Sequence, residues 1–293
     1  MATAPAAADD LILPFRLENA QLRGKIIRLG GAITEIIARH DYPGPVSALL
    51  GEAACLAGLM GASLKFDGRF ILQSQSDGPV SLMVADFATP GDLRAYARFD
   101  PAEVASGADM LGKGHLAFTI DQGTHMERYQ GIVALEGQTL ADAAHGYFER
   151  SEQIPTRIHL AAGPIKTGEG EGWRAGGIML QHLPGEGGTP VAAAAEDWNR
   201  AGLLLKTVEA HELLDPTLAP EQLLYRLFHE EQVRVFDPQP LRAHCGCSEA
   251  GVSSMLEQFS ADERAGMLDG NGLITVNCQF CSRKYHFSPD GFK

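Results

Sequence analysis

The sequence is short of positive charge, and this shortage argues against one common class of function. It has 24 lysine and arginine residues against 37 aspartate and glutamate residues, a formal net charge of -13. Basic contacts to backbone phosphates supply nearly all of the affinity of non-specific nucleic-acid complexes and much of that of specific ones. An acidic chain with no basic cluster lacks those contacts. We therefore expect no specific nucleic-acid partner.

The sequence also lacks an export signal and a long hydrophobic run. Residues 1–9 hold neither a basic region nor a long apolar stretch, which predicts a flexible N-terminus and not a secretory signal. The least polar segment, residues 47–64, is interrupted by Glu52, is followed by Lys65 and is rich in alanine and glycine. It predicts a closely packed buried helix and not a membrane span. We therefore expect a cytoplasmic protein with no membrane partner.

Catalytic motifs are missing as well. The chain has no Gly-x-Ser-x-Gly elbow and no His-Glu-x-x-His motif. Residues 168–172 are rich in glycine, but Glu169 and Glu171 would repel a phosphate, and no Gly-Lys-Ser/Thr sequence follows them. The sequence therefore predicts a protein that is not an enzyme.

Short strand-like runs separated by turns are present throughout residues 10–189. Turns such as Asp77-Gly78-Pro79 join successive runs, which favours antiparallel pairing. Thr139 can cap a helix over residues 140–150. The region predicts an α+β domain with an antiparallel sheet and packed helices. Its strands are expected at residues 22–29, 69–75, 80–87, 93–99, 114–121, 129–133, 156–161 and 177–183.

Residues 190–240 predict a helical linker that is not stable alone. A glycine-rich boundary, residues 185–190, precedes helical patterns over residues 196–214 and 220–233. Pro216 and Pro238 follow the two helices and end them. The segment has too little chain for a core of its own, so it must pack on another surface. Its expected apolar face consists of Trp198, Leu204, Leu205, Leu224 and Phe228.

Cysteine is scarce, and four of the five cysteines fall in residues 241–293. Cys245 and Cys247 form a Cys-x-Cys pair, and Cys278 and Cys281 form a Cys-x-x-Cys pair after a spacer of thirty residues. Zinc binds four thiolates in a tetrahedron, and two close-set pairs supply them. The spacing therefore predicts a small domain that holds one zinc ion through these four cysteines.

Other interpretations of the cysteines stay open. The zinc could be purely structural, or it could belong to a nucleic-acid-binding zinc ribbon, although the acidic composition disfavours the latter. A thiol–disulfide oxidoreductase is a further alternative, but its βαβ pattern is missing from this end of the chain. His244 and His286 lie beside the cluster and are expected to remain outside the ligand set. Cys55, alone in an apolar helix pattern, predicts a buried structural residue.

The energetics of oxidation favour a reversible folding switch. A structural zinc contributes on the order of 10–16 kcal/mol of apparent binding free energy, and in a small domain this is folding free energy. Oxidised thiolates do not hold the metal. Oxidation between nearest neighbours would give Cys245–Cys247 and Cys278–Cys281, which close very small loops and restore little stability. The tail would then unfold.

The sequence resembles the heat-shock protein 33 family of redox-regulated holdase chaperones over nearly its whole length. The cysteine cluster resembles the family's switch domain, with Tyr285 and Phe287 beside it. The remaining resemblance is carried by residues 225–231 in the linker, by Arg23-Gly24, His40-Asp41-Tyr42-Pro43, Leu50-Gly51-Glu52-Ala53 and Glu127-Arg128-Tyr129-Gln130-Gly131, and by the most distinctive stretch, residues 147–156.

This resemblance implies a function and a set of partners. The reduced protein, with zinc on its four cysteines, would be a monomer with little activity. Oxidation would form the Cys245–Cys247 and Cys278–Cys281 disulfides, expel zinc and release the linker, which exposes a client-binding surface. The active homodimer would hold unfolding client proteins without ATP and later pass them to ATP-dependent chaperones. Residues 10–189 would form the chaperone and dimerisation domain, and residues 241–293 the redox switch.

Overall fold

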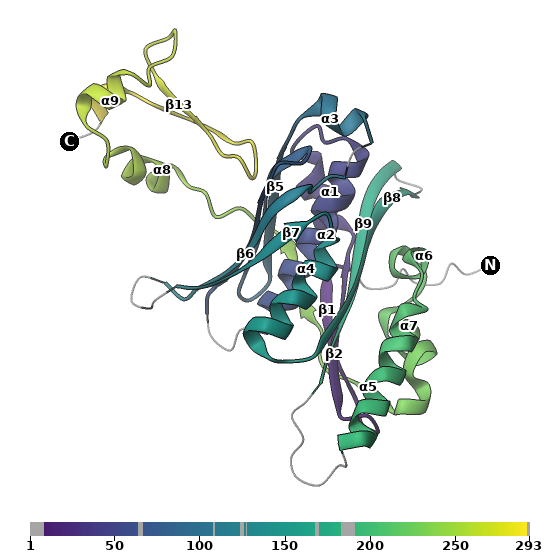
Figure 1. Ribbon diagram of the computed structural model, residues 1–293. Coiled ribbons are helices and arrows are strands. Elements are labelled where there is room, and N and C mark those ends of the chain that lie inside the picture. Colours follow the sequence, from purple (N-terminus) through teal and green to yellow (C-terminus); the bar gives the residue numbers. More distant parts are fainter. Residues whose placement is uncertain are drawn as a thin grey trace. The chain divides into compact units, whose positions relative to one another are not determined.

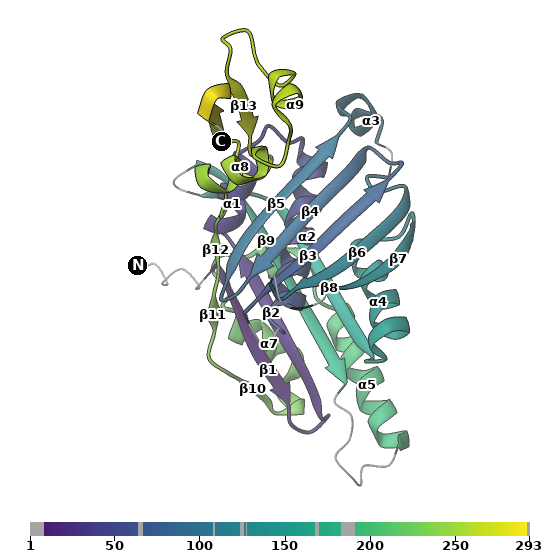
Figure 2. The same ribbon diagram turned by 90° about the vertical axis from the view of Figure 1, so that its left-hand side faces the viewer.

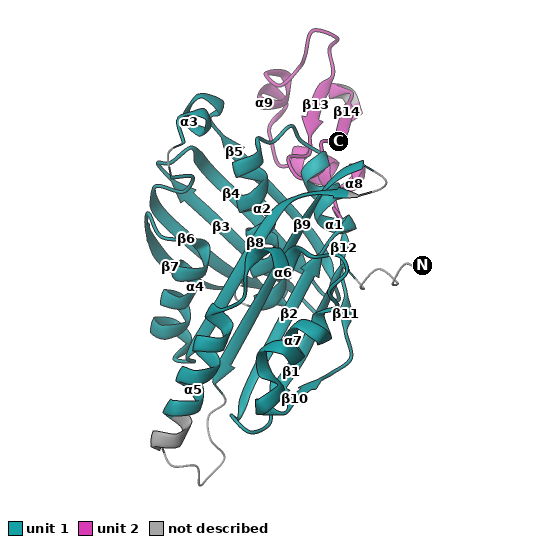
Figure 3. Cartoon of the chain, turned by 90° about the vertical axis from the view of Figure 1, so that its right-hand side faces the viewer, with its two compact units in different colours: residues 1–243 teal, residues 244–293 magenta. Residues whose placement is uncertain are grey.

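The computed structural model describes residues 9–63, 67–107, 109–123, 126, 128–167, 170–182 and 191–291. The predicted linker boundary at residues 185–190 and nearly all of the predicted flexible N-terminus lie outside these residues. The chain divides into two compact units, residues 1–243 and residues 244–293 (Figure 3). Each unit is described by itself below.

The first sheet of the large unit brings distant parts of the chain together. Its strands follow the order β10-β1-β2-β9-β8, and β11 also pairs with β1. All of these pairings are antiparallel, as predicted. The bounds are β1 Leu11–Leu17, β2 Leu22–Leu29, β8 Thr156–Thr167, β9 Gly170–His182, β10 Val233–Val235 and β11 Gln239–Pro240.

The second sheet contains strands that are joined by turns predicted from the sequence, such as Asp77-Gly78-Pro79 between β3 and β4. Its order is β12-β5-β4-β3-β6-β7, and Figure 2 shows β5, β4, β3, β6 and β7 side by side. The short β12 runs parallel to its neighbour, β5, and the other strand pairs described in this sheet are antiparallel. The bounds are β3 Arg69–Ser76, β4 Val80–Ala88, β5 Asp92–Phe99, β6 Lys113–Asp121, β7 Tyr129–Glu136 and β12 Arg242–Ala243.

Helix α2 (Gly44–Gly61) fills the space between the two sheets and contacts strands of both (Figure 1). Glycines allow this close approach, because a side chain at Gly58 would overlap Ile27 and one at Gly61 would overlap Phe87. By length and composition α2 could cross a membrane, but 72% of its apolar window is buried inside the protein. The predicted buried helix is confirmed, and Cys55 is fully buried within it.

The described part of the large unit that precedes the linker also holds the shorter helices α1, α3 and α4 and the π-helical segment η1. Helices α1 (Gly31–Ala38) and α3 (Pro101–Ala105) follow strands of the first and second sheet. Thr139 caps α4 (Leu140–Tyr147) as predicted, because its side chain accepts a hydrogen bond from the Asp142 amide. The α-helix does not run on to residue 150, since the chain changes to the π-helical η1 (Phe148–Glu152).

The linker packs on the first sheet through a second apolar core. The linker consists of α5 (Val191–Lys206), α6 (Ala210–Leu214) and α7 (Pro220–Phe228), with the short 3-10 helix η2 (His229–Glu231) before β10. The predicted single helix over residues 196–214 is wrong. The Thr207 hydroxyl donates to the Leu204 carbonyl where α5 ends, and Glu209 and Glu212 form a capping box that starts α6. The second predicted helix ends at Phe228, before residue 233.

The C-terminal unit is small and has little apolar core. Its elements are α8 (Glu249–Leu256), α9 (Ala261–Ala265), the hairpin strands β13 (Ile274–Asn277) and β14 (Lys284–Phe287), and the short η3 (Pro289–Gly291). The spacer between the two cysteine pairs holds a helical stretch that is divided into α8 and α9. Ser260 interrupts it because its hydroxyl caps α9 in a capping box with Glu263.

Candidate metal centre

The Cys-x-x-Cys pair is presented by the tight turn between β13 and β14. The Cys278 amide donates to the Arg283 carbonyl (2.9 Å), and the Ser282 amide donates to the Cys278 carbonyl (2.9 Å). Ser282 has a left-handed backbone, with φ of 58°. Hydrogen bonds on both sides thus hold the turn closed. The Cys-x-Cys pair precedes α8, whose N-terminus is capped by the Ser248 hydroxyl.

The structure brings all four tail cysteines to one point. Their sulfur atoms all lie within 4.8 Å of one another. The Cys245 and Cys278 sulfurs are 3.7 Å apart, and those of Cys247 and Cys281 are 3.4 Å apart. A disulfide would place two sulfurs roughly 2.05 Å apart, so these are free thiols. Both of these contacts join one pair to the other.

The spacing of the sulfurs fits a bound metal ion. Zn–S bonds of roughly 2.3 Å in a tetrahedron place neighbouring sulfurs about 3.8 Å apart. The separations of 3.4 and 3.7 Å lie just below this value, and four soft thiolates from two short loops favour zinc over a hard cation. His286 lies outside the cluster, where its Nδ1 makes a 3.0 Å hydrogen bond with the Thr275 hydroxyl.

Tyr285, on β14, contacts the cluster directly. It is 8% exposed, and its hydroxyl donates to the Cys247 sulfur at 3.2 Å. Burial alone would raise the pKa of Cys247, but hydrogen bonds from Tyr285 and from the other three thiols lower it to about 7. Burial raises the pKa of Cys281 to about 12. With no ion bound, the cluster therefore favours a thiolate at Cys247.

The predicted apolar face of the linker lies against the first sheet. Leu205, Leu224 and Phe228 are buried, and Trp198 and Leu204 pack at the edge of the same cluster. The Phe228 ring stacks on Phe15 of β1, with centroids 6.0 Å apart. Sheet residues contribute the other half of this core, namely Leu11, Leu13, Phe15, Leu17, Leu22, Ile26, Ala161, Ile178 and Leu180.

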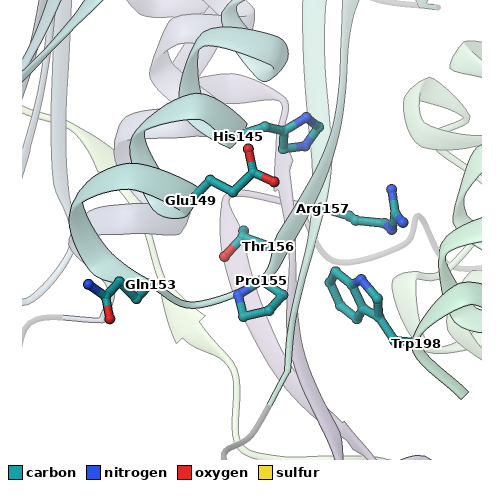
Figure 4. Close-up of a pocket in the computed structure, with 7 residues that line it drawn as sticks. All are labelled: His145, Glu149, Gln153, Pro155, Thr156, Arg157 and Trp198. Atoms are coloured by element: carbon teal, nitrogen blue, oxygen red, sulfur yellow. The ribbon is translucent and has the colours of Figure 1, made fainter. Parts of the chain in front are cut away.

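A pocket of about 380 Å³ lies where α5 meets η1 and the start of β8 (Figure 4). Its lining includes His145, Glu149, Thr156 and Arg157, and Trp198 closes it from the linker side. The Arg157 guanidinium lies 5.1 Å from the centre of the Trp198 ring, within the range of a cation–π contact. Glu149, Gln153, Pro155 and Thr156, four residues of the distinctive stretch over residues 147–156, thus line a pocket that the linker closes.

One residue that holds the linker, Arg28, was not predicted from the sequence. Arg28, on β2, is fully buried beneath α6. Its Nη1 donates to the Glu212 carbonyl (3.4 Å), and its Nη2 donates to the Asp215 carbonyl. Arg28 is one of three basic residues in the predicted strand over residues 22–29, and strand alternation places it on the face of Leu22 and Ile26. The sequence does not show, however, which segment covers that side chain.

A half-buried ion pair fixes the other end of the linker. Arg200 of α5 binds Glu231 of η2 through two contacts, Nε–Oε1 at 2.6 Å and Nη2–Oε2 at 3.1 Å. The Glu231 side chain is almost fully buried. This fork of parallel hydrogen bonds ties the first linker helix to the segment after the last.

Comparisons with known proteins agree with one another. The model of the family described as Hsp33 protein matches residues 10–288. A 33 kDa chaperonin of Caulobacter vibrioides is 47% identical over 292 residues, covering 97% of this chain and 96% of the relative. A 33 kDa chaperonin of Azotobacter vinelandii is 39% identical over 282 residues, covering 95% and 91%.

A solved structure matches the fold. The chain is similar to the crystal structure of the 33 kDa chaperonin, or heat shock protein 33 homolog, of Thermotoga maritima. The TM-score is 0.77 at 22% sequence identity, and 96% of each chain is covered. At this identity the likeness supports the fold alone.

Fold and site together define a class of protein. It has a large α+β unit whose first sheet is covered by a helical linker, followed by a small unit with four convergent thiols. The comparisons place the chain within that class: it belongs to the Hsp33 family and is a chaperone. The predicted family and the α+β fold are therefore confirmed, and unfolded proteins are its clients.

Proposed function

We propose that this chaperone is an ATP-independent holdase that oxidation switches on. In its reduced state, Cys245, Cys247, Cys278 and Cys281 hold one zinc ion, and the linker covers the first sheet. In its oxidised state the tail and the linker unfold and expose apolar surface for unfolding clients. The convergence of four free thiols in a unit with almost no apolar core is the observation that carries this proposal.

Zinc, when bound, supplies the bonds that hold the two cysteine pairs together. The described residues of the tail bury only Leu256, Ile274 and Tyr285 among their hydrophobic side chains. Such a unit is below the size at which a hydrophobic core alone is sufficient. Losing the four thiolates therefore removes most of its stability.

Oxidation proceeds by a balanced two-electron step at each pair of thiols. Two thiols give up two electrons and two protons to hydrogen peroxide, one S–S bond forms, and the peroxide is reduced to two water molecules. We propose the pairs Cys245–Cys247 and Cys278–Cys281. Neither disulfide leaves a thiolate for a metal, and reduction restores all four thiols.

The choice of pairs decides whether the switch works. The contacts of Cys245 with Cys278 and of Cys247 with Cys281 span 33 and 34 residues. Disulfides across such loops stabilise a fold by about 4 kcal/mol each, whereas loops of two or three residues give about 1–2 kcal/mol. Cross-pairing would thus keep the tail folded, and only pairing within each motif releases it.

Release of the tail leads to release of the linker by way of the chain itself. The two-residue strands β11 and β12 lie between the linker helices and Cys245. Short pairings of this kind fray easily once the chain beyond them unfolds. The linker helices then expose Leu205, Leu224 and Phe228 and uncover the sheet beneath. Exposed apolar surface of that kind binds unfolding proteins and favours a homodimer.

Roles for the regions and the cellular partners complete the proposal. Residues 10–189 form the chaperone and dimerisation domain, residues 190–240 the metastable linker, and residues 241–293 the redox switch. The protein acts in the cytoplasm, and it hands its clients to ATP-dependent chaperones when reducing conditions return. These assignments follow the family to which the chain belongs.

The test is to follow zinc, thiols and activity in one titration with peroxide. Zinc release measured with a chelating dye, thiol counts and suppression of citrate synthase aggregation should change together, and reduction with added zinc should reverse all three. Peptide mapping should find the two proposed disulfides. Equal activity of reduced and oxidised protein would refute the switch.

Matched cysteine variants sharpen this test. Cys278→Ser removes one of the four convergent thiols, so it should retain zinc poorly and lose the sharp dependence of activity on peroxide. Cys55→Ala changes the cysteine that is buried in α2, far along the chain from the cluster. It should keep the wild-type zinc stoichiometry and peroxide response.

A further inference from the structure

Arg28 differs from the neighbouring buried arginine, Arg174, in the groups that accept its hydrogen bonds, although the charge of Asp9 acts on both. Arg174 is 3% exposed and makes a two-point ion pair with Asp9, which precedes β1. Arg28 is 0% exposed and donates to the carbonyls of Glu212 and Asp215, both in the linker. Among the described residues, no hydrogen-bond acceptor lies within reach of its Nε. The linker thus supplies every hydrogen bond that Arg28 makes in the described part of the chain.

The linker meets Arg28 with the carbonyl end of a helix and an acidic residue. Asp215 is the C-cap of α6, and the last carbonyls of a helix lack partners within it and carry partial negative charge. Hydrogen bonds from Thr217 lower the pKa of the Asp215 carboxyl, and the nearby charges of Arg28 and Arg174 lower it further. The contact is therefore electrostatically complementary as well as apolar.

The sheet beneath α6 is shaped to receive a backbone. A side chain at Gly176 of β9 would lie 3.0 Å from the Leu213 carbonyl oxygen, and one at Gly163 of β8 would lie 3.3 Å from Leu214. Glycine at these positions lets the end of α6 approach Arg28 closely. The apolar core formed by Phe15, Leu22 and their neighbours extends over the same face of the sheet.

We propose that, once the linker has left, this face selects client segments that resemble it: apolar helical segments ending in an acidic residue, whose carboxylate or carbonyl end binds Arg28. This inference rests on the proposed function and names its substrate class. Once uncovered, Arg28 is a cation beside an apolar face, and a client carboxylate or carbonyl accepts charge-assisted hydrogen bonds from it in place of the linker carbonyls. A client with a basic end would instead meet a like charge.

The test uses the oxidised full-length protein and three labelled amphipathic peptides. The peptides share one apolar sequence and an amidated C-terminus, and they differ only in a final Asp, Asn or Lys. By fluorescence anisotropy, the Asp peptide should bind the wild-type protein about fivefold more tightly than the Asn peptide and more than tenfold more tightly than the Lys peptide. Equal binding of the three peptides would overturn the inference without any variant.

Variants on one strand assign the preference to Arg28. In Arg28→Met the three affinities should converge to within twofold, and in Arg28→Lys, which keeps the charge, the order should remain. Arg23→Met is the matched control, because Arg23 lies on the same strand, is exposed and binds Gln181. It should keep the wild-type order. Loss of the order in both Arg28→Lys and Arg23→Met would place the preference elsewhere and overturn the inference.

The outcomes separate this inference from the function on which it rests. Oxidised protein that suppresses aggregation but binds the three peptides equally refutes the selectivity alone. Oxidised protein that neither suppresses aggregation nor binds any peptide refutes the holdase and the selectivity together. An oxidised dimer that suppresses aggregation but excludes all peptides would mean that the linker of a second copy occupies the face, and this too overturns the inference.

Discussion

Helix α2 buries thirteen residues within a single element, whereas the described residues of the whole C-terminal unit bury three hydrophobic side chains. The first region derives its stability from apolar surface removed from water, at roughly 25 cal/mol per Å². The second has four thiols where a core would be. One region is thus insensitive to oxidants and the other depends on the redox state of a few atoms. The contrast allows one part of the protein to unfold while another stays folded.

Removing the metal should have the largest effect on this contrast. Chelation of zinc, or oxidation, should make residues 244–293 sensitive to protease while the core around α2 stays protected, because a structural zinc contributes on the order of 10–16 kcal/mol to a small domain. Limited proteolysis with mass spectrometry measures both regions in one sample. A tail that resists protease without its metal would contradict the comparison.

The stability of the linker should lie between that of the core around α2 and that of the C-terminal unit. The variant Phe228→Ala tests this expectation. Phe228 is fully buried against Phe15, so truncation should cost about 3–5 kcal/mol of docking energy. The reduced, metal-loaded variant should show faster hydrogen exchange in α7 and partial holdase activity. Tyr225→Ala, on the same helix but at a residue 64% exposed, is the control and should behave as wild type. Equal protection of α7 in both variants would show that the linker is held elsewhere.

The core has its own sensitivity, to pH. Burial raises the pKa of Glu52, on α2, from 4.5 to about 7. The folded state therefore binds this proton more tightly than the unfolded chain, and the stabilisation is complete below pH 4.5 and lost as the pH rises through 7. We expect the unfolding free energy to fall by about 2–3 kcal/mol over this range.

Glu52→Gln should flatten the dependence of the unfolding free energy on pH. Glu136→Gln, a change at an exposed position, should leave this dependence as it is in the wild type. Both tryptophans, Trp173 and Trp198, lie in the large unit, so their fluorescence reports its unfolding without a signal from the tail. A pH profile that is the same in wild type and Glu52→Gln would assign the dependence to other groups.

The smallest expected effect is at the cluster itself. Tyr285→Phe removes the hydroxyl that donates to the Cys247 sulfur but keeps the buried ring. Groups that hydrogen-bond to metal ligands typically contribute at least tenfold to affinity, so zinc binding should weaken by about tenfold. A competition titration with a chelator of known affinity measures the change. Unaltered affinity would limit the role of Tyr285 to packing.

The elements of this fold that begin at turn and capping residues could be predicted from the sequence. Turns such as Asp77-Gly78-Pro79 and the cap at Thr139 are short-range signals, and strands and a helix begin where they indicate. Strand β1 was missed because Pro14 interrupts its pattern, and a proline is tolerated there because its carbonyl, not an amide, bonds Phe236.

Long-range contacts limited what could be predicted of the site. The spacing of the four cysteines was sufficient to predict that they converge, because a pair of close-set thiols points to one place. The role of Arg28 was not predictable, since a charged residue in a strand does not reveal which distant segment will cover it. The hydrogen bond from Tyr285 likewise depends on how β14 turns toward the cluster.

The last residues before the tail belong to both sheets at once. Gln239 and Pro240 pair with β1 of the first sheet, and two residues later Arg242 and Ala243 pair with β5 of the second. Five consecutive residues therefore join the edges of the two sheets, between which α2 lies. Unfolding of the C-terminal unit would therefore break the pairing of β12 with β5 first and the pairing of β11 with β1 second. Refolding would restore the two edge pairings in the reverse order.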